Sequence, residues 1–200
     1  MEFSKLTIGS LNVGGFKSRP NKISLIFEFA KNLDILVFQE THFINSFDTT
    51  FFEQVFGSNF FIFHSFGPEK FSGTCVLFNK KVFEENLNIS FEIPGRCMAI
   101  IMNINGFSML LTGIYAPAQA DPREKFFQNL FKKIQLSANS TDFSEMIIVG
   151  DFNFVEDPTI DRFPKKKNPV YCERGFKEFI EIQNEFSVKD PFRKAMSGKN

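Results

Sequence analysis

The chain has 200 residues, of which 43% are hydrophobic and 23% are charged. This length suits one domain, and the composition supplies enough apolar surface for a packed core, which excludes a disordered chain. The 23 basic and 23 acidic residues cancel, so no whole-protein field attracts nucleic acid or an anionic membrane. Any contact with nucleic acid must therefore be local.

The apolar stretches are short and the cysteines are widely spaced. A run such as Met98–Met102 falls far below the roughly 18 to 20 apolar residues that span a bilayer, so we expect no transmembrane segment and no membrane partner. The first residues contain an early acid and no sustained apolar run, which argues against a signal peptide. Cys75, Cys97 and Cys172 fit neither a disulfide framework nor a zinc site, which indicates an intracellular protein.

The first half of the chain alternates between strand and helix periods, which is typical of sheets covered by helices. We expect a strand over residues 6–11, a helix over 21–32, a strand over 34–38 and a short helix beginning near Asp48. A β-meander is predicted next, with strands over 59–65, 74–79, 86–92, 97–104 and 107–115.

The second half begins with the strongest helix signal in the sequence. Asp121 is expected at the N-cap, Pro122 at the first helical position and Glu124 as the capping-box partner. A strand over 145–150 and a last helix over 173–186 complete the pattern.

Two of the predicted buried strands end in acidic side chains. Glu40 follows the strand over 34–38, and a carboxylate there can bind a hard cation such as Mg²⁺, although a lone acid at a strand end is more often a solvated cap. Asp151 and Asn153 end the strand over 145–150, and an extended backbone would place them on one face. An acid beside an amide suits the positioning of water and of a phosphate oxygen.

Four motifs then occur in an order that is far more specific than any one of them. They are Leu11-Asn12, Phe38-Gln-Glu-Thr41, Ile114-Tyr-Ala-Pro117 and Gly150-Asp-Phe-Asn153. This set resembles the endonuclease/exonuclease/phosphatase superfamily, which includes the apurinic-type DNA endonucleases. Three further segments make the chain most similar to the endonuclease domain of non-LTR (LINE-type) retrotransposons: Gln39-Glu-Thr-His42, Gly95-Arg96 and Asp161-Arg162.

The resemblance covers roughly residues 6–193 and implies an α/β fold, a four-layer sandwich. Two mostly antiparallel sheets would pack face to face with helices outside, as in DNase I-like proteins. It also implies a phosphodiester hydrolase that needs Mg²⁺, or Mn²⁺ in its place, and that nicks DNA in the nucleus. The parent protein would carry a C-terminal reverse transcriptase.

The resemblance also implies a role for each matching residue. Glu40 would be the principal metal ligand, and Asn12 would support both metal and phosphate. Tyr115 would contact the scissile phosphate through its hydroxyl. Asp151 would orient or deprotonate the attacking water, or protonate the leaving oxygen, and Asn153 would hold a phosphate oxygen.

Three basic positions are further candidates for substrate binding. Arg96 and Arg162 match positions of the family, although sequence alone does not separate a phosphate contact from an internal ion pair. Lys165–Lys167 could contact DNA phosphates, but such a run in a Pro-containing loop is more often a solvated surface.

The chain departs from the family at its end. The family closes with an Asp-bearing strand and a Ser-Asp-His motif that residues 1–200 lack, so we expect one domain without its last strands, which binds metal but nicks little. Such a domain should also be less stable and more prone to associate. His42 could replace the missing histidine, although a strand-end histidine is usually only solvated, and His64 is predicted at the edge of the core.

Two alternatives to a retrotransposon endonuclease remain at this point. One is another phosphoesterase of the same fold, either a repair-type abasic endonuclease or a phosphatase of small substrates. The other is a non-catalytic remnant that keeps the fold, which the zero net charge and the missing histidine favour.

Overall fold

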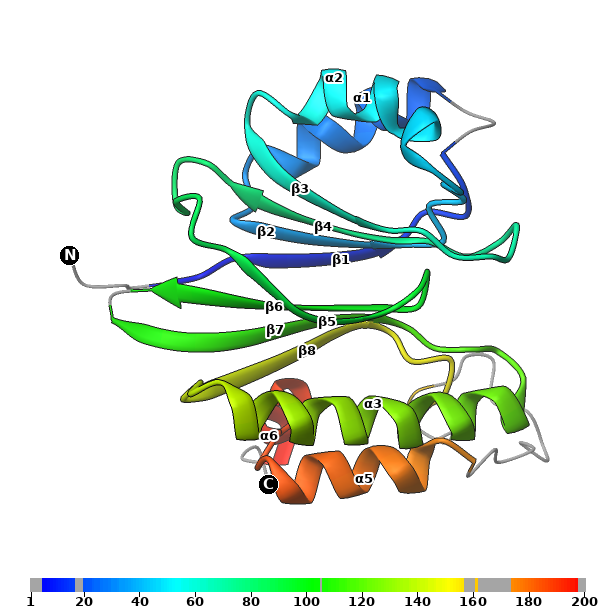
Figure 1. Ribbon diagram of the computed structural model, residues 1–200, viewed down its shortest axis with the longest axis vertical. Coiled ribbons are helices and arrows are strands. Elements are labelled where there is room, and N and C mark those ends of the chain that lie inside the picture. The colour runs from blue at the N-terminus through cyan, green and yellow to red at the C-terminus, as the bar shows by residue number, and fades with distance from the viewer. Residues whose placement is uncertain (1–4, 17–19, 105, 157–160, 162–173, 198–200) are drawn as a thin grey trace.

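The computed structural model describes residues 5–16, 20–104, 106–156, 161 and 174–197. Two sheets pack face to face, with α1 and α2 outside one and α3, α5 and α6 outside the other (Figure 1). In chain order, the elements are β1 (Ile8–Asn12), α1 (Pro20–Ala30), β2 (Ile35–Gln39), η1 (Ser46–Thr49), α2 (Thr50–Phe56), β3 (Phe60–Ser65), β4 (Thr74–Asn79), β5 (Asn88–Ile93), β6 (Cys97–Ile104), β7 (Phe107–Tyr115), α3 (Ala120–Ser140), β8 (Glu145–Asp151), α5 (Phe176–Glu185) and α6 (Pro191–Ser197). The predicted four-layer α/β sandwich is confirmed.

The strands divide between the sheets in the orders β1-β2-β4-β3 and β5-β6-β7-β8. Each sheet contains one parallel pair, β1 with β2 and β7 with β8, and the other pairs are antiparallel. The predicted continuous meander is therefore wrong, because the chain crosses from one sheet to the other between Asn79 and Asn88. Period-two hydrophobicity identifies a strand but does not indicate which sheet it joins.

Strand β2 is a continuous apolar run because both of its faces are buried. Leu36 and Phe38 pack under α1 and α2, whereas Ile35 and Val37 belong to the core between the two sheets. All five residues of β2 are buried, since alternating side chains enter two different cores. This double burial holds the strand end, where Glu40 follows, in a fixed place.

The two sheets pack closely where Gly113 of β7 faces Val37 of β2. A Cβ atom at this position would lie 2.7 Å from Val37 Cγ1 and 3.3 Å from Val76 Cγ2, so any side chain here would push the sheets apart. Gly113 lies two residues before Tyr115 and Val37 lies three before Glu40. The spacing of the sheets is thus set directly behind the ends of these strands.

The start of α3 differs from the prediction. Gln119, not Asp121, is the N-cap, and no side chain caps the helix there. Asp121 instead forms an ion pair with Arg174, next to α5, and that tertiary contact outweighs the local cap.

The short helix α6 was not predicted, and Arg162, Lys165–Lys167 and Cys172 lie outside the described residues.

Both cysteines that the structure describes lie in the core. Cys75 and Cys97 are buried free thiols, and burial raises the pKa of both well above the ordinary value, so they are inert core residues. Within the part of the chain that the structure describes, no helix combines the length and the apolar character needed to cross a membrane.

His64 lies at the edge of an aromatic core, as predicted. Its ring meets those of Phe43, Phe52 and Phe66 at centroid distances of 5.7 Å each. Burial lowers the pKa of His64 from 6.5 to about 4, and the nearby Glu53, with Oε1 3.5 Å from Nε2, offsets this only in part. His64 is therefore neutral in the folded protein at pH 7.

This histidine should make the fold acid-sensitive. The pKa of His64 is 6.5 in the unfolded chain and about 4 in the folded chain. The stability that neutral His64 contributes is therefore present above pH 6.5 and is lost as the pH falls from 6.5 to about 4. Between pH 7 and pH 5 the loss is roughly 2 kcal/mol. Urea unfolding at both pH values should show a smaller difference for His64→Phe than for the wild type, and an equal difference would contradict the assignment.

Candidate active site

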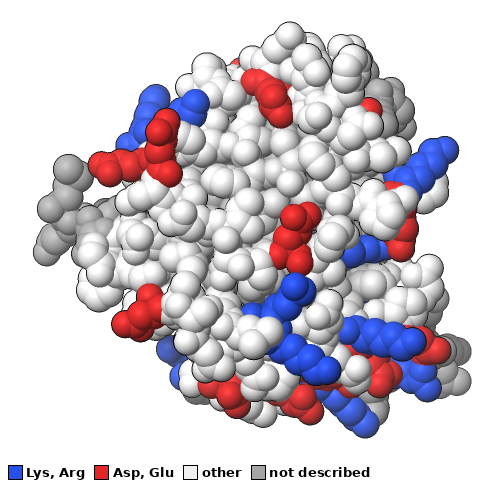
Figure 2. All heavy atoms as spheres, viewed as in Figure 1, with Lys and Arg blue, Asp and Glu red and all other residues white. Residues whose placement is uncertain are grey.

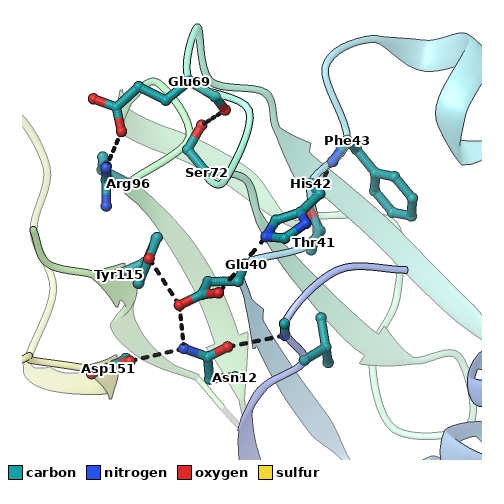
Figure 3. Close-up of polar contacts among 12 residues, drawn as sticks. Asn12, Glu40, Thr41, His42, Phe43, Glu69, Ser72, Arg96, Tyr115 and Asp151 are labelled. Carbon is teal, nitrogen blue, oxygen red and sulfur yellow. Dashed lines mark hydrogen bonds and ion pairs between the residues drawn. The ribbon is translucent and has the colours of Figure 1, made fainter. Parts of the chain in front are cut away.

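Four polar side chains meet where strands of both sheets end (Figure 3). Asn12 is the last residue of β1 and Glu40 directly follows β2, while Tyr115 and Asp151 are the last residues of β7 and β8. Because β1 runs parallel to β2, and β7 to β8, each pair delivers its carboxyl ends to one edge of its sheet. Face-to-face packing then brings the two edges together.

The hydrogen bonds among these residues join the two sheets. Asn12 Nδ2 donates to Glu40 Oε1 over 2.8 Å and to Asp151 Oδ2 over 3.0 Å, and the Tyr115 hydroxyl donates to Glu40 Oε1 over 2.9 Å. Since both carboxylate oxygens bond to one nitrogen, they are at most about 6 Å apart. The prediction that Glu40 and Asp151 converge is confirmed. Asn12 and Asp151 also line an open groove of about 550 Å³.

The backbone of the site is locally strained. Glu40, His42 and Asn153 have φ values of 55°, 59° and 52°, in the left-handed region that non-glycine residues seldom adopt. Backbone hydrogen bonds hold the segment after β2 in this shape, since Gly15 N donates to Glu40 O over 2.7 Å and Thr41 N donates to Gly73 O over 3.1 Å. Strain retained by such contacts turns the Glu40 carboxylate toward the opposite sheet.

Asn153 lines the same open groove as Asn12 and Asp151, but it does not reach the groove through the predicted extended backbone. Its backbone is not extended, so the two-residue spacing does not by itself put Asn153 on the face of Asp151. The Asn153 amide Nδ2 donates to Ala116 O over 2.7 Å, and its backbone N donates to Asp151 Oδ1 over 3.0 Å. In this structure Asn153 thus fixes the position of Asp151 and the turn after β8.

Arg96 adds a cation beside Tyr115. Its guanidinium lies 4.6 Å from the centroid of the Tyr115 ring and forms an ion pair with Glu69 (Figure 3). Of the two possibilities left open by the sequence, the structure shows the ion pair. Arg162, the other basic candidate, lies outside the described residues.

The electrostatics of the site keep Tyr115 protonated. Burial raises the pKa of its hydroxyl to about 12, and the hydrogen bond and the charge of Glu40 act in the same direction, while Arg96 opposes them. The hydroxyl therefore remains a hydrogen-bond donor at neutral pH. On the face seen in Figure 2, basic side chains gather mainly over the lower part of the molecule, with acidic side chains among them.

Sequence reasoning missed two residues that hold the site together. Glu69 orients Arg96, and the buried Arg123 donates to Ala118 O over 2.7 Å and to Asn153 O over 2.9 Å, which supports the turn after β8. The local pattern did not indicate the partners, because Glu69 lies 27 residues from Arg96 and Arg123 lies 30 residues from Asn153. An arginine on the apolar face of α3 was the only available signal for Arg123.

Comparison with known families gives this arrangement a context. Residues 9–191 match the model of the Endonuclease/Exonuclease/phosphatase family. The chain belongs to this family. Its members include hydrolases that cleave phosphoester bonds, and the four residues that meet in Figure 3 come from the motifs that resembled the superfamily in the sequence.

Three relatives show how far the family likeness extends. The chain is 26% identical over 191 residues to the Transposon TX1 uncharacterized 149 kDa protein of Xenopus laevis, with 94% of the chain aligned to 14% of that protein. An AP endonuclease from Leishmania major has a TM-score of 0.70 at 16% identity, covering 95% of this chain and 69% of its own. An AP endonuclease from Archaeoglobus fulgidus scores 0.59 at 22% identity, with 89% and 71% covered. The two structures support the fold, and the chain spans a small part of the transposon protein.

The contact between Tyr115 and Glu40 can be tested by titration. Glu40→Gln removes the charge that opposes tyrosinate formation, so the pKa of Tyr115 should fall from about 12 toward 10. Absorbance near 295 nm follows this ionisation, and subtracting the curve of Tyr115→Phe isolates it from that of Tyr171. An unchanged curve in Glu40→Gln would show that the two side chains do not interact.

Proposed function

We propose that this member of the family is a metal-dependent phosphodiester hydrolase that nicks DNA, as the endonuclease domain of a retrotransposon polyprotein. The single observation that carries the proposal is one hydrogen-bonded cluster, in which Asn12 bonds to both Glu40 and Asp151 and the Tyr115 hydroxyl bonds to Glu40. Two carboxylates and two neutral hydrogen-bonding groups in one cluster can hold a cation, a water and a phosphate together. The likeness to a transposon protein supports the origin.

The donor set suits Mg²⁺, with Mn²⁺ as a substitute. Within the described ranges no group of three or more His, Cys, Asp or Glu side chains is arranged to hold a metal, so the site offers one or two carboxylates. Mg²⁺ is commonly held by one or two carboxylates, with waters and substrate phosphate completing its shell. Glu40 would hold the ion, with Asn12 beside it, and the bound ion would supply positive charge to the phosphate as negative charge develops.

The other residues of the site are assigned to the phosphate and the water. Asp151, fixed through Asn153 and Asn12, would orient or deprotonate the attacking water, or protonate the leaving oxygen. The Tyr115 hydroxyl, protonated at neutral pH, would exchange its bond to Glu40 for one to a phosphate oxygen. Arg96 would add charge next to that oxygen once released from Glu69.

The proposed substrate is DNA in the nucleus, and the proposed parent protein also carries a reverse transcriptase. Abasic DNA is the main alternative to intact DNA as the substrate, because two AP endonucleases share this fold. Comparing intact plasmid, abasic DNA and a small phosphomonoester as substrates separates these activities.

Removing either acid should abolish nicking of supercoiled plasmid in Mg²⁺. Glu40→Gln or Asp151→Asn should reduce the rate at least roughly 100-fold, because each variant loses charge or positioning that acts in the transition state. Glu145→Gln, at the other end of β8, is the matched control and should nick like the wild type. All variants should keep the wild-type circular dichroism spectrum, since these side chains lie outside the core.

Cation binding is measured separately, by the paramagnetic resonance of Mn²⁺. Glu40→Gln should weaken it and Glu145→Gln should not. Undiminished nicking in both acid variants would show that other residues carry the chemistry. Mn²⁺ binding without any nicking, even with protein in excess over plasmid, would favour the non-catalytic remnant.

A further inference from the structure

The loop between β3 and β4, residues 66–73, can be followed in Figure 1. It carries an exposed aromatic side chain, that of Phe71. Phe71 leaves 61% of its surface exposed, and its ring meets that of His42 edge to face with centroids 5.3 Å apart. His42 Nε2 in turn lies 3.7 Å from Glu40 Oε2. One imidazole ring therefore separates Phe71 from the carboxylate of the site.

Hydrogen bonds fix this loop to the backbone of the site. Thr41 N donates to Gly73 O over 3.1 Å, and His42 N donates to Ser72 O over 3.0 Å. Ser72 Oγ donates to Glu69 O over 2.7 Å, which closes the loop on itself (Figure 3). A ring on such a support is pre-organised, so binding to its exposed face loses little conformational entropy.

The loop also presents a positive charge. Lys70 Nζ lies 5.7 Å from the centroid of the Phe71 ring. The neighbouring Glu69 is paired with Arg96, and no ion pair of Lys70 is seen among the described residues. A cation therefore lies over the ring of Phe71, on the loop that Glu69 joins to Arg96.

We propose that Phe71 and Lys70 form a nucleotide subsite, in which an unstacked base lies on the Phe71 ring and Lys70 contacts the adjoining backbone phosphate. This inference rests on the proposed function and narrows its substrate to DNA with an unpaired or easily unstacked base beside the cut. Aromatic rings that stack bases next to cations that follow the backbone are the common means of binding single strands.

The surroundings of Phe71 favour a base over a protein partner. The other exposed residues of the loop are Pro68, Glu69 and Lys70, so no apolar patch continues along it from the ring. Stable protein interfaces bury roughly 800 Å² on each partner around several anchors. One ring beside one cation matches a single nucleotide instead.

The test uses the whole chain in EDTA and a short oligothymidine that carries one 2-aminopurine. Stacking on Phe71 should quench the 2-aminopurine fluorescence on binding. Phe71→Ala should bind roughly 10-fold more weakly and lose the quenching, whereas Phe71→Tyr should keep both. Phe107→Ala is the matched control, because Phe107 is 63% exposed but lies at the opposite end of β7 from Tyr115.

Lys70 is tested through the salt dependence of the same binding. Lys70→Ala should weaken binding and lower the slope of log affinity against log salt by about 0.7, the value for one contact to a single strand. The quenching at saturation should remain, since the ring is intact. If the slope is the same in the wild type and Lys70→Ala, Lys70 does not contact a phosphate and is not part of the subsite.

Two results would overturn the subsite: no binding of the oligonucleotide by the wild type, or equal affinity and quenching in the wild type and Phe71→Ala. Plasmid nicking in Mg²⁺ is followed in parallel with the same proteins. Loss of quenching in Phe71→Ala supports the subsite whether or not the wild type nicks. Absence of nicking by the wild type counts against the proposed function alone.

Discussion

One side-chain amide, that of Asn12, bonds to a carboxylate from each of the two sheets. Glu40 belongs to the first sheet and Asp151 to the second, so the pair exists only while the sheets keep their spacing and register. The core between the sheets holds that spacing, and parallel pairing within each sheet aligns the strand ends. The chemistry proposed for the site is therefore a property of the whole sandwich.

The polar groups at this joint are arranged so that few charges stand alone. The Asn12 amide lies between the two acids, Tyr115 stays neutral beside Glu40, and Arg96 is neutralised by Glu69. A substrate phosphate and its cation would enter a site whose partners are already paired with one another. Binding would then exchange existing hydrogen bonds for new ones, with little reorganisation of the backbone.

The sequence predicted the strands well because their apolar segments are separated by residues that mark turns. The bounds of β6 and β7 agree with the prediction to the residue. It failed where distant contacts decide the outcome: the N-terminus of α3 depends on Arg174, and the crossover between sheets leaves no local pattern. The left-handed backbone at Glu40 was also unpredictable, since no glycine marks it.

The site residues divide in the same way. Glu40 and Asp151 followed from strand ends and from ordered motifs, because those features are local in sequence. The link from Phe71 through His42 to Glu40, and that from Glu69 to Arg96, depend on a loop whose place only the fold defines. Gly113 also depends on the fold, because a side chain there would meet Val37 and Val76 of the facing sheet. It contacts none of the site residues, yet it allows the sheets that carry Glu40 and Asp151 to pack closely. In a selection for activity, position 113 would thus tolerate as little variation as a substrate-contacting residue, through geometry alone.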